Sequence, residues 1–436
     1  MRYFLIAMGL FLCMPLLNAQ ENNFGIKWSG FVRNDMMYNT RQVVSARAEG
    51  GFFLAPTAIL ENEDGDDLNA IPNINLVGFT TRLKGSITGP DAFGATTSGA
   101  IEADFFGTNG TTKFGLRLRH AFVKLDWGGS QLLTGQYWHP TFVTDCYPGT
   151  ISFGAGVPFN PLARNPQIRY TKKLGENLSV FGAILAQGHF NSIAGDNAQP
   201  NSGIPELHIQ FQFKNDKVAA GVGVNYLTLK PANTTMLFGT DTTTVIAKEN
   251  VSGLSAVAYF KVKTDPVTFK LWGQYGQLTD SKVMMGGFYP IIDSTITDFS
   301  KEFVRYNPIT AISAWMDVHT NGKKTQFGLF AGYTSNMGVA LGTDEMIAGS
   351  YVGRWGNVES MMRVAPRIKF ISGNMSIGFE VEYSTANYAA PKFMDDGITP
   401  DVTNDPNGTG IDDNGVVTNF QTADNIKVLT SFTYKF

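Results

Sequence analysis

The chain ends with Val428-Leu429-Thr430-Ser431-Phe432-Thr433-Tyr434-Lys435-Phe436, and this stretch decides the fold. Apolar side chains stand at Val428, Phe432, Tyr434 and Phe436, with Lys427, Ser431, Thr433 and Lys435 between or beside them. Successive side chains of a β-strand point to opposite faces, so one face of this segment is apolar and the other polar. The stretch therefore predicts a strand at the boundary between an apolar and a polar environment.

The same alternation recurs along the chain in segments of about 10 residues, the length of a tilted membrane strand. About sixteen segments can be distinguished, and they begin near residues 25, 74, 93, 113, 130, 165, 177, 205, 217, 251, 267, 309, 325, 357, 375 and 425. No stretch reaches the ~18 uninterrupted apolar residues that a spanning helix needs. Charged residues make up only 16%, which suits a wall that faces lipid. Because lipid satisfies no backbone hydrogen-bonding group, we predict an all-β, closed, antiparallel transmembrane barrel with about 16 strands.

The connections between these segments alternate between short and long. Seven are tight turns rich in Gly, Asn, Asp and Pro, at residues 89–91, 126–129, 173–176, 214–216, 264–266, 320–323 and 372–374. The others are mostly long loops, at about 40–72, 139–164, 189–204, 231–250, 279–308, 335–356 and 389–424, with one short member at 107–112. This sorting is typical of a membrane barrel with turns at one end and loops at the other. A soluble β-sandwich or propeller, the alternative, would not sort its connections in this way.

Both ends of the chain indicate export to an outer membrane. A positive start and an apolar run precede Leu17-Asn18-Ala19, so residues 1–19 are predicted to be a cleaved signal peptide. A lipoprotein signal acylated at Cys13 is the weaker alternative, because bulky Leu12 stands where a small residue is expected. Residues 20–436 are predicted to be a single barrel domain. A last strand that ends on an aromatic residue resembles those of bacterial outer-membrane barrels.

Charged residues fall on one face of the predicted strands. This set comprises Arg33, Asp35, Arg82, Lys84, Glu102, Asp104, Arg117, Arg119, Arg169, Arg363 and Arg367. A charge that faces lipid at mid-bilayer costs ~2–4 kcal/mol, so these side chains are expected to face the interior. Sixteen-stranded barrels leave an aqueous channel, whereas eight-stranded ones are filled by side chains. The set is therefore predicted to line a pore that passes hydrated solutes.

The long loop at 139–164 is predicted to fold inward and narrow the pore. It is rich in Pro, Gly and aromatic residues and poor in charge, which suits packing against protein more than exposure to water. The residues predicted to form the constriction are Asp145, Tyr147, Phe153 and Phe159.

Four stretches give the chain a resemblance to a known family. They are Ser29-Gly30-Phe31-Val32-Arg33-Asn34-Asp35, Gly99-Ala100-Ile101-Glu102-Ala103-Asp104-Phe105, Leu133-Thr134-Gly135-Gln136-Tyr137-Trp138 and Asn165-Pro166-Gln167-Ile168-Arg169-Tyr170. With them the chain resembles the DcaP-like outer-membrane porins over most of its first 190 residues and its last strand. The resemblance implies a sixteen-stranded barrel, a trimer and a constriction by the third loop. The N-terminal coiled-coil segment of some members is not matched, so a trimer would rest on barrel contacts.

The resemblance also implies an electric field across the pore. It would set the acidic loop residue Asp145 opposite Arg82, Arg117 and Arg119. The alternative is that Arg117 and Arg119 pair with Glu102 and Asp104 on the neighbouring strand. Arginine outnumbers the acids on these strands, which favours a mild preference for anions.

The function predicted is passive diffusion of small hydrophilic solutes, with a preference for anions, across the outer membrane. The expected partners are outer-membrane lipid, the solutes and two further copies in a homotrimer. No nucleic acid is expected, because the formal charge of −3 comes with no basic cluster. Alternatives are an adhesion or receptor barrel, and a transporter with a specific site.

We expect no enzyme activity, no cofactor and no resident metal. Glu102 and Asp104 share a strand face, but pore lining explains them without a catalytic role. The histidines are scattered without metal-ligand spacing. Asp405, Asn407 and Asp412 are a weak calcium candidate, since an EF-hand would need glutamate where Val416 stands.

Overall fold

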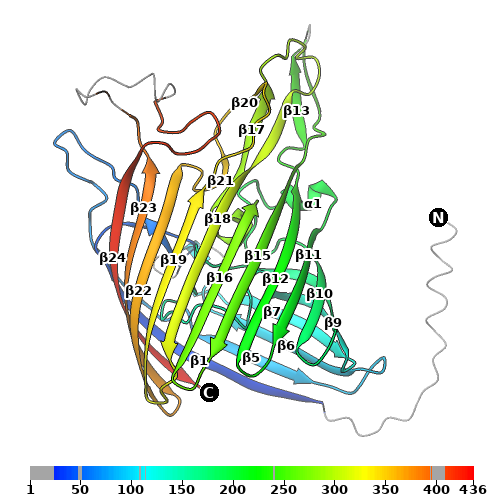
Figure 1. Ribbon diagram of the computed structural model, residues 1–436, viewed down its shortest axis with the longest axis vertical. Helices are drawn as coiled ribbons and strands as arrows, with labels where there is room; N and C mark the ends of the chain where they lie inside the picture. Colours follow the sequence, from blue (N-terminus) through cyan, green and yellow to red (C-terminus); the bar gives the residue numbers. More distant parts are fainter. Residues whose placement is uncertain are drawn as a thin grey trace, which may run out of the picture.

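The computed structural model describes residues 24–47, 52–107, 110–112, 114–238, 241–392, 394 and 408–436. They form a closed antiparallel barrel of 16 strands, nearly all β (Figure 1). Strand β1 (Gly25–Asn39) pairs with β24 (Phe420–Lys435), from Phe31 opposite Lys435 to Asn39 opposite Lys427, and this pairing closes the barrel. The sequence-based prediction of the fold class is confirmed.

The remaining wall strands follow one another around the barrel in chain order. They are β4 (Asn73–Val77) with β5 (Arg82–Thr88), β6 (Thr96–Asp104), β7 (Arg117–Asp126), β8 (Ser130–Trp138), β9 (Arg164–Lys173), β10 (Leu178–Leu185), β11 (Glu206–Lys214), β12 (Val218–Leu229), β15 (Val251–Lys263), β16 (Val267–Gln277), β18 (Val304–Thr320), β19 (Thr325–Asn336), β22 (Val358–Ser372) and β23 (Met375–Ala389). Strands β4 and β5 both pair with β1 and form one interrupted wall strand.

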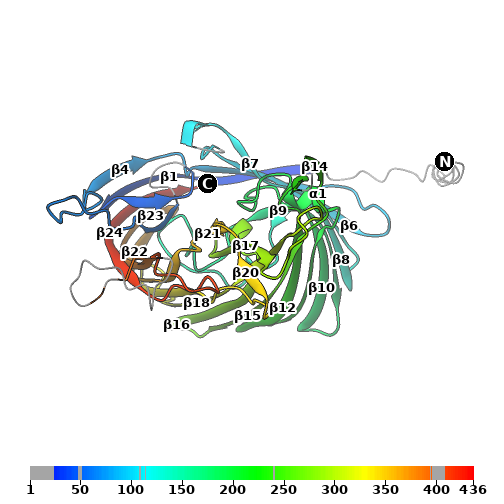
Figure 2. The same cartoon turned by 90° about the horizontal axis from the view of Figure 1, so that it is seen from above.

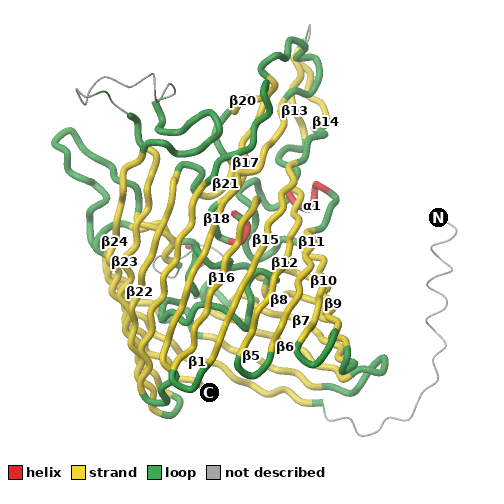
Figure 3. Tube along the Cα trace, viewed as in Figure 1, coloured by secondary structure: helices red, strands yellow, loops and turns green. Residues whose placement is uncertain are grey.

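The short turns gather at one end of the barrel and the long loops at the other (Figure 3). The loops carry small elements: β2 (Val43–Ser45), β3 (Phe53–Pro56), η2 (Gly110–Thr112), α1 (Ala198–Ser202), β13 (Thr234–Phe238), β14 (Thr242–Ile246), η3 (Asp280–Lys282), β17 (Gly286–Asp293), β20 (Glu345–Ile347) and β21 (Val352–Arg354). Strand β18 begins five residues earlier than predicted, because its first residues, Val304–Ile309, pair with β17 above the wall. No helix among the described residues is long and apolar enough to cross a membrane.

The last strand shows the alternation that decided the fold. In β24 the side chains of Ala423, Asn425, Lys427 and Leu429 are buried, whereas Ile426, Val428, Phe432 and Tyr434 are exposed on the outer face. The other wall strands repeat this pattern. An outer band of apolar side chains is what a strand in contact with lipid requires.

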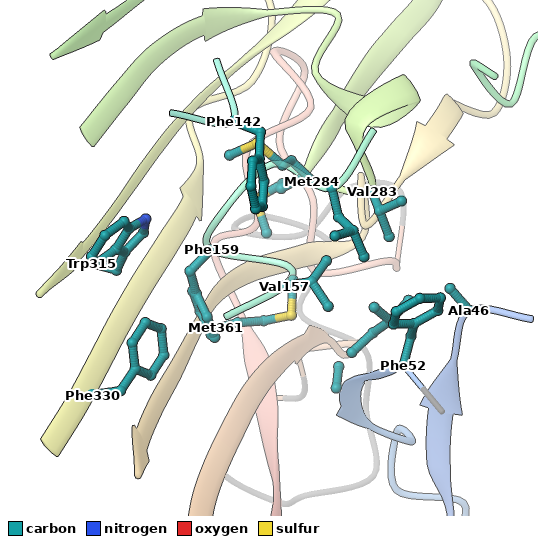
Figure 4. Close-up of a cluster of buried hydrophobic side chains, with 14 of the residues drawn as sticks. Ala46, Phe52, Phe142, Val157, Phe159, Val283, Met284, Trp315, Phe330 and Met361 are labelled. Carbon is teal, nitrogen blue, oxygen red and sulfur yellow. The ribbon is translucent and has the colours of Figure 1, made fainter. Parts of the chain in front are cut away.

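The interior of the barrel is packed more densely than an open channel. Apolar side chains from the loops form a buried cluster with those of the wall, as Figure 4 shows for Phe52, Phe142, Val157, Phe159 and Met284 beside Trp315, Phe330 and Met361. On the wall, Gly332 makes room for this cluster, because a Cβ there would lie 2.5 Å from the Phe159 ring. The loops therefore provide a hydrophobic core inside the barrel.

Candidate functional site

The loop between β8 and β9, residues 139–163, runs through the barrel interior. Its backbone carbonyls accept hydrogen bonds from inward side chains of β16: Trp272 Nε1 donates to Thr141 (3.2 Å) and Lys270 Nζ to Tyr147 (2.9 Å). On β18, the Asp317 carboxylate accepts from the N–H of Gly149 at 3.1 Å. Buried peptide groups need partners, and the wall strands supply them here. The predicted inward folding of this loop is confirmed.

Further along, the same loop is held by β22 and β23. Both carboxylate oxygens of Glu380 accept hydrogen bonds at 2.8 Å, one from the N–H of Ile151 and one from that of Ser152. Arg363 donates from Nη1 to the carbonyl of Val157 at 2.8 Å. Such bonds involve a charged partner and are roughly twice as strong as neutral ones. Charged groups of the wall thus fix the path of the loop.

A second inward segment comes from the first long loop. Phe52, Phe53, Leu54 and Ala55 are all buried in the interior. Arg363 joins this segment to the longer loop, since its Nη2 donates to the carbonyl of Leu54 at 2.8 Å. The first loop was not predicted to fold inward.

Between the loop and the opposite wall lies a cavity of about 400 Å³. Four arginines border it, Arg33, Arg82, Arg119 and Arg164, although Arg119 and Arg164 are only 2% and 1% exposed. Aromatic rings border it as well: Phe31, Phe52, Trp138, Phe142, Tyr147 and Phe153. A smaller cavity of about 160 Å³ shares Phe31, Arg33 and Thr150 with it and adds Lys369 and Lys435, near the turn end of the barrel. The two cavities are therefore neighbours, and cations border both of them.

Two acids pair with the arginines at and beside the larger cavity. Asp104 forms a bidentate pair with Arg117, with N–O distances of 2.6 and 3.0 Å, and accepts from Arg119 Nη1 at 2.9 Å. Glu102 accepts from Arg119 Nε at 2.7 Å and lies 3.5 Å from Arg82 Nε. Arg117 and Arg119 therefore pair with the neighbouring strand, which was the second of the two sequence-based interpretations.

Two further cations of this region, Arg164 and Arg47, were not predicted. Arg164 has no carboxylate within 4.0 Å among the described residues; its guanidinium lies 4.5 Å from the Trp138 ring and donates to His189 Nε2 at 2.8 Å. Arg47 donates to the carbonyls of Gly107 and His189. Arg164 is the first residue of β9 and directly precedes the segment predicted as that strand, which was a signal in the sequence, whereas Arg47 and His189 lie in loops without periodicity.

Positive charge exceeds negative charge around the larger cavity. The cations are Arg33, Arg47, Arg82, Arg117, Arg119 and Arg164, and the acids are Asp35, Glu102 and Asp104. Burial, followed by repulsion from Arg164 and Arg47, holds the pKa of His189 well below its usual range. Neutral His189 therefore accepts hydrogen bonds from Arg117 and Arg164 without adding charge. Burial lowers the pKa of Arg47 to about 9, so this group remains a cation at neutral pH.

Several residues predicted to line the pore lie beside loops or neighbouring side chains instead of at the cavity. Arg363 is 3% exposed and lies 4.4 Å from the Phe53 ring, and Arg367 pairs with Asp317 at 2.8 Å. Arg169 donates to Gln167 and to the carbonyl of Trp138. Arg117, Asp104 and Asp35 are buried in ion pairs, and Lys84 does not border the cavity. The inward segments cover charges that the sequence pattern assigned to open water.

Of the four residues predicted to form the constriction, only two border the cavity. Tyr147 and Phe153 border the cavity, whereas Phe159 is buried against Phe330 and Gly332. Asp145 does not face the arginines, because its Oδ1 pairs with Lys214 Nζ at 2.7 Å. The arrangement with Asp145 opposite Arg82, Arg117 and Arg119 is therefore wrong for this structure.

The structure adds no support for the calcium candidate. Asp405 and Asn407 lie outside the described residues, and Asp412 uses Oδ1 to accept from the N–H groups of Asn414 and Val416. Within the described ranges, no three His, Cys, Asp or Glu side chains gather as a metal site.

Solved structures of outer-membrane channels share this architecture. The outer-membrane channel DcaP of Acinetobacter baumannii superimposes with a TM-score of 0.63 at 16% identity, over 95% of this chain and 97% of that one. OmpT of Vibrio cholerae gives 0.51 at 9% identity, over 96% and 99%, and its trimer form gives 0.50 at 9%, over 95% and 99%. No protein-family model and no curated protein matches the sequence.

The chain thus has the fold of a bacterial outer-membrane porin. The likeness to DcaP confirms, at the level of the fold, the resemblance that the sequence indicated.

Proposed function

We propose that this protein is a passive channel for small hydrophilic anions across the bacterial outer membrane. The observation that carries the proposal is the excess of guanidinium groups around the cavity between the loop 139–163 and β1, β5, β7 and β9. Lys369 and Lys435 extend the positive lining toward the turn end. A narrow passage of one sign concentrates counter-ions and excludes ions of like charge.

In this proposal the loop 139–163 forms the constriction. It lines the cavity together with the arginines and contributes Tyr147 and Phe153 to it. Solute passes down its gradient, with no catalytic step and no cofactor. The rings beside the arginines limit the freedom of those side chains: the guanidinium of Arg82 lies 5.0 Å from the Phe31 ring and 5.5 Å from the Phe153 ring.

The biological unit proposed is a homotrimer in the outer membrane. A trimer form is described for OmpT of Vibrio cholerae, whose barrel has a similar fold. Residues 1–19 are proposed to direct export and to be removed, leaving 20–436 as one barrel domain. Cross-linking of the protein in native membranes would test the trimer.

Ion selectivity tests the function. Purified protein is inserted into a planar bilayer, and the reversal potential is measured under a potassium chloride gradient. We expect chloride to be preferred, and Arg82→Gln to lower the chloride-to-potassium permeability ratio at least twofold. Lys248→Gln, an exposed residue of an external loop, is the control and should leave the ratio unchanged. A wild-type channel that prefers potassium would refute the proposal.

A further inference from the structure

The loop end of the barrel carries a small sheet that lies over the opening. Strand β17 pairs with β20, with Ile291 opposite Ile347, and also with β21; seen from above, these strands project over the barrel mouth (Figure 2). A turn of the last loop packs beside them, because the N–H of Val339 donates to the carbonyl of Asn414 at 2.8 Å. A cavity of about 630 Å³ lies between β17, β20 and this turn.

The lining of this cavity has the opposite charge to the arginine-lined cavity inside the barrel. Its charged side chains are Glu345, Asp412 and Asp413, and no lysine or arginine of the described chain borders it. Two tyrosine rings, Tyr289 and Tyr351, meet edge to face with centroids 6.1 Å apart. A pocket of this size with apolar walls and a few polar groups is typical of small-molecule sites.

Tyr289 supplies a polar atom without a partner. The residue is only 4% exposed, and its hydroxyl forms no hydrogen bond within the described part of the chain. Its ring lies against the turn of the last loop, where a Cβ on Gly415 would come within 2.7 Å of Tyr289 Cε2. Because this hydroxyl opens to the cavity, a ligand there would replace water as its hydrogen-bond partner.

The carboxylates keep capacity for a ligand. Asp412 uses one oxygen, Oδ1, for the N–H groups of Asn414 and Val416, both at 2.9 Å. Glu345 uses Oε2 for the N–H of Gly342 at 2.8 Å, and its Oε1 is 3.7 Å from the exposed Arg305. Oxygen atoms of three carboxylates therefore remain around two aromatic rings.

We propose that this cavity binds an amphipathic organic cation, with its ammonium group between the carboxylates and the Tyr289 hydroxyl and its apolar body against the tyrosine rings. Ion pairing and cation–π attraction act together on such a ligand. The site shares no lining residue with the cavity of about 400 Å³ inside the barrel, here called the basic cavity. It therefore does not depend on the proposed passage of anions.

Three small aromatic probes that differ in charge test the site. Benzylamine, which is a cation at neutral pH, benzyl alcohol and benzoate are titrated into the refolded full-length protein by calorimetry. We expect benzylamine to bind at least tenfold more tightly than benzyl alcohol. Any binding of benzoate should be unchanged by Asp413→Asn, because an anion would be attracted to the arginine-lined cavity inside the barrel instead. Asp413→Asn and Glu345→Gln should each weaken benzylamine at least threefold. Tyr289→Phe should weaken it less than Tyr289→Leu, which also removes the ring.

Matched controls distinguish binding of benzylamine in the cavity from its general attraction to acidic loops. Asp298→Asn removes an exposed carboxylate of the loop before β18 that does not border the cavity, and it should leave binding unchanged. Equal binding of benzylamine and benzyl alcohol, tighter binding of a neutral disaccharide, or an equal loss in Asp298→Asn would each overturn the proposal. Heat-modifiable migration on gels shows that each variant is folded before it is titrated.

Discussion

Strands β5 to β9 and strands β16 to β23 both set apolar side chains outside and charged ones inside, yet only the first group borders the basic cavity. On β5 and β7, Arg82 and Arg119 border this cavity while they pair with Glu102, although Arg119 is only 2% exposed. On β22 and β23, Arg363 and Glu380 bind peptide groups of the inward loops. An inward charge can therefore act on a solute or on the protein's own backbone, and the loop path decides which.

Removal of the inward loop should expose the charges of strands β16 to β23 to water, as those at the cavity of strands β5 to β9 are. Deletion of residues 143–157 takes away the peptide groups bound by Glu380, Lys270 and Asp317. We expect single-channel conductance to rise several-fold, because these wall charges would then face water. The matched control is deletion of the β13–β14 hairpin, residues 234–246, which should leave conductance unchanged. Unaltered conductance after the 143–157 deletion would show that this loop does not limit the passage.

The variants Arg363→Gln and Arg82→Gln should affect different properties. Arg363 joins two inward segments and lies 3.8 Å from Glu382, so its loss leaves a buried acid with one partner fewer. Loss of one member of a buried pair costs about 3–5 kcal/mol. Urea unfolding in detergent should show this loss for Arg363→Gln. The loss should be smaller for Arg82→Gln, because Arg82 is more exposed and Glu102 keeps Arg119 as a partner, and this variant should mainly alter ion preference. Equal destabilisation by both variants would contradict the distinction between inward charges that hold the loops and inward charges that border the cavity.

Glu380→Gln should loosen the loop with a smaller loss of stability. An amide has one carbonyl oxygen in place of two carboxylate oxygens, so only one of the N–H groups of Ile151 and Ser152 keeps an acceptor. A buried donor left without a partner costs about 1–3 kcal/mol. We expect larger current fluctuations in the open channel and a matching loss in urea unfolding. Asp216→Asn, in an exposed turn, is the control. A Glu380→Gln channel with wild-type stability and wild-type current noise would show that the hydrogen bonds of Glu380 do not hold the loop.

Asp145→Asn should have the smallest effect. The pair of Asp145 with Lys214 is largely exposed, with side-chain exposures of 38% and 61%, and such pairs contribute about 1 kcal/mol or less. Ion preference and stability should therefore stay close to wild type. A large shift in reversal potential would instead place Asp145 in the passage, as the family resemblance implied.

The sequence was sufficient to predict the barrel because period-two alternation is local. Every wall strand was predicted, and the inward direction of Arg119 or Arg363 followed from parity alone. The contacts that cover these charges were not predictable, since they join distant residues: Arg363 and Leu54 are 309 positions apart. No local pattern distinguishes Arg363, which holds two loops, from Arg82, which borders the cavity. The inward course of Phe52–Ala55 was missed for the same reason.

The loop-derived core inside the barrel has a consequence for biogenesis. Phe52–Ala55 and Val157–Phe159 leave the ribosome long before β18, β22 and β23, the strands that cover them. Until those strands arrive and β24 closes on β1, the apolar segments have no native surface to pack against. Exposed apolar segments of an unfinished chain promote aggregation. The chain is therefore expected to be most prone to aggregation before the barrel closes.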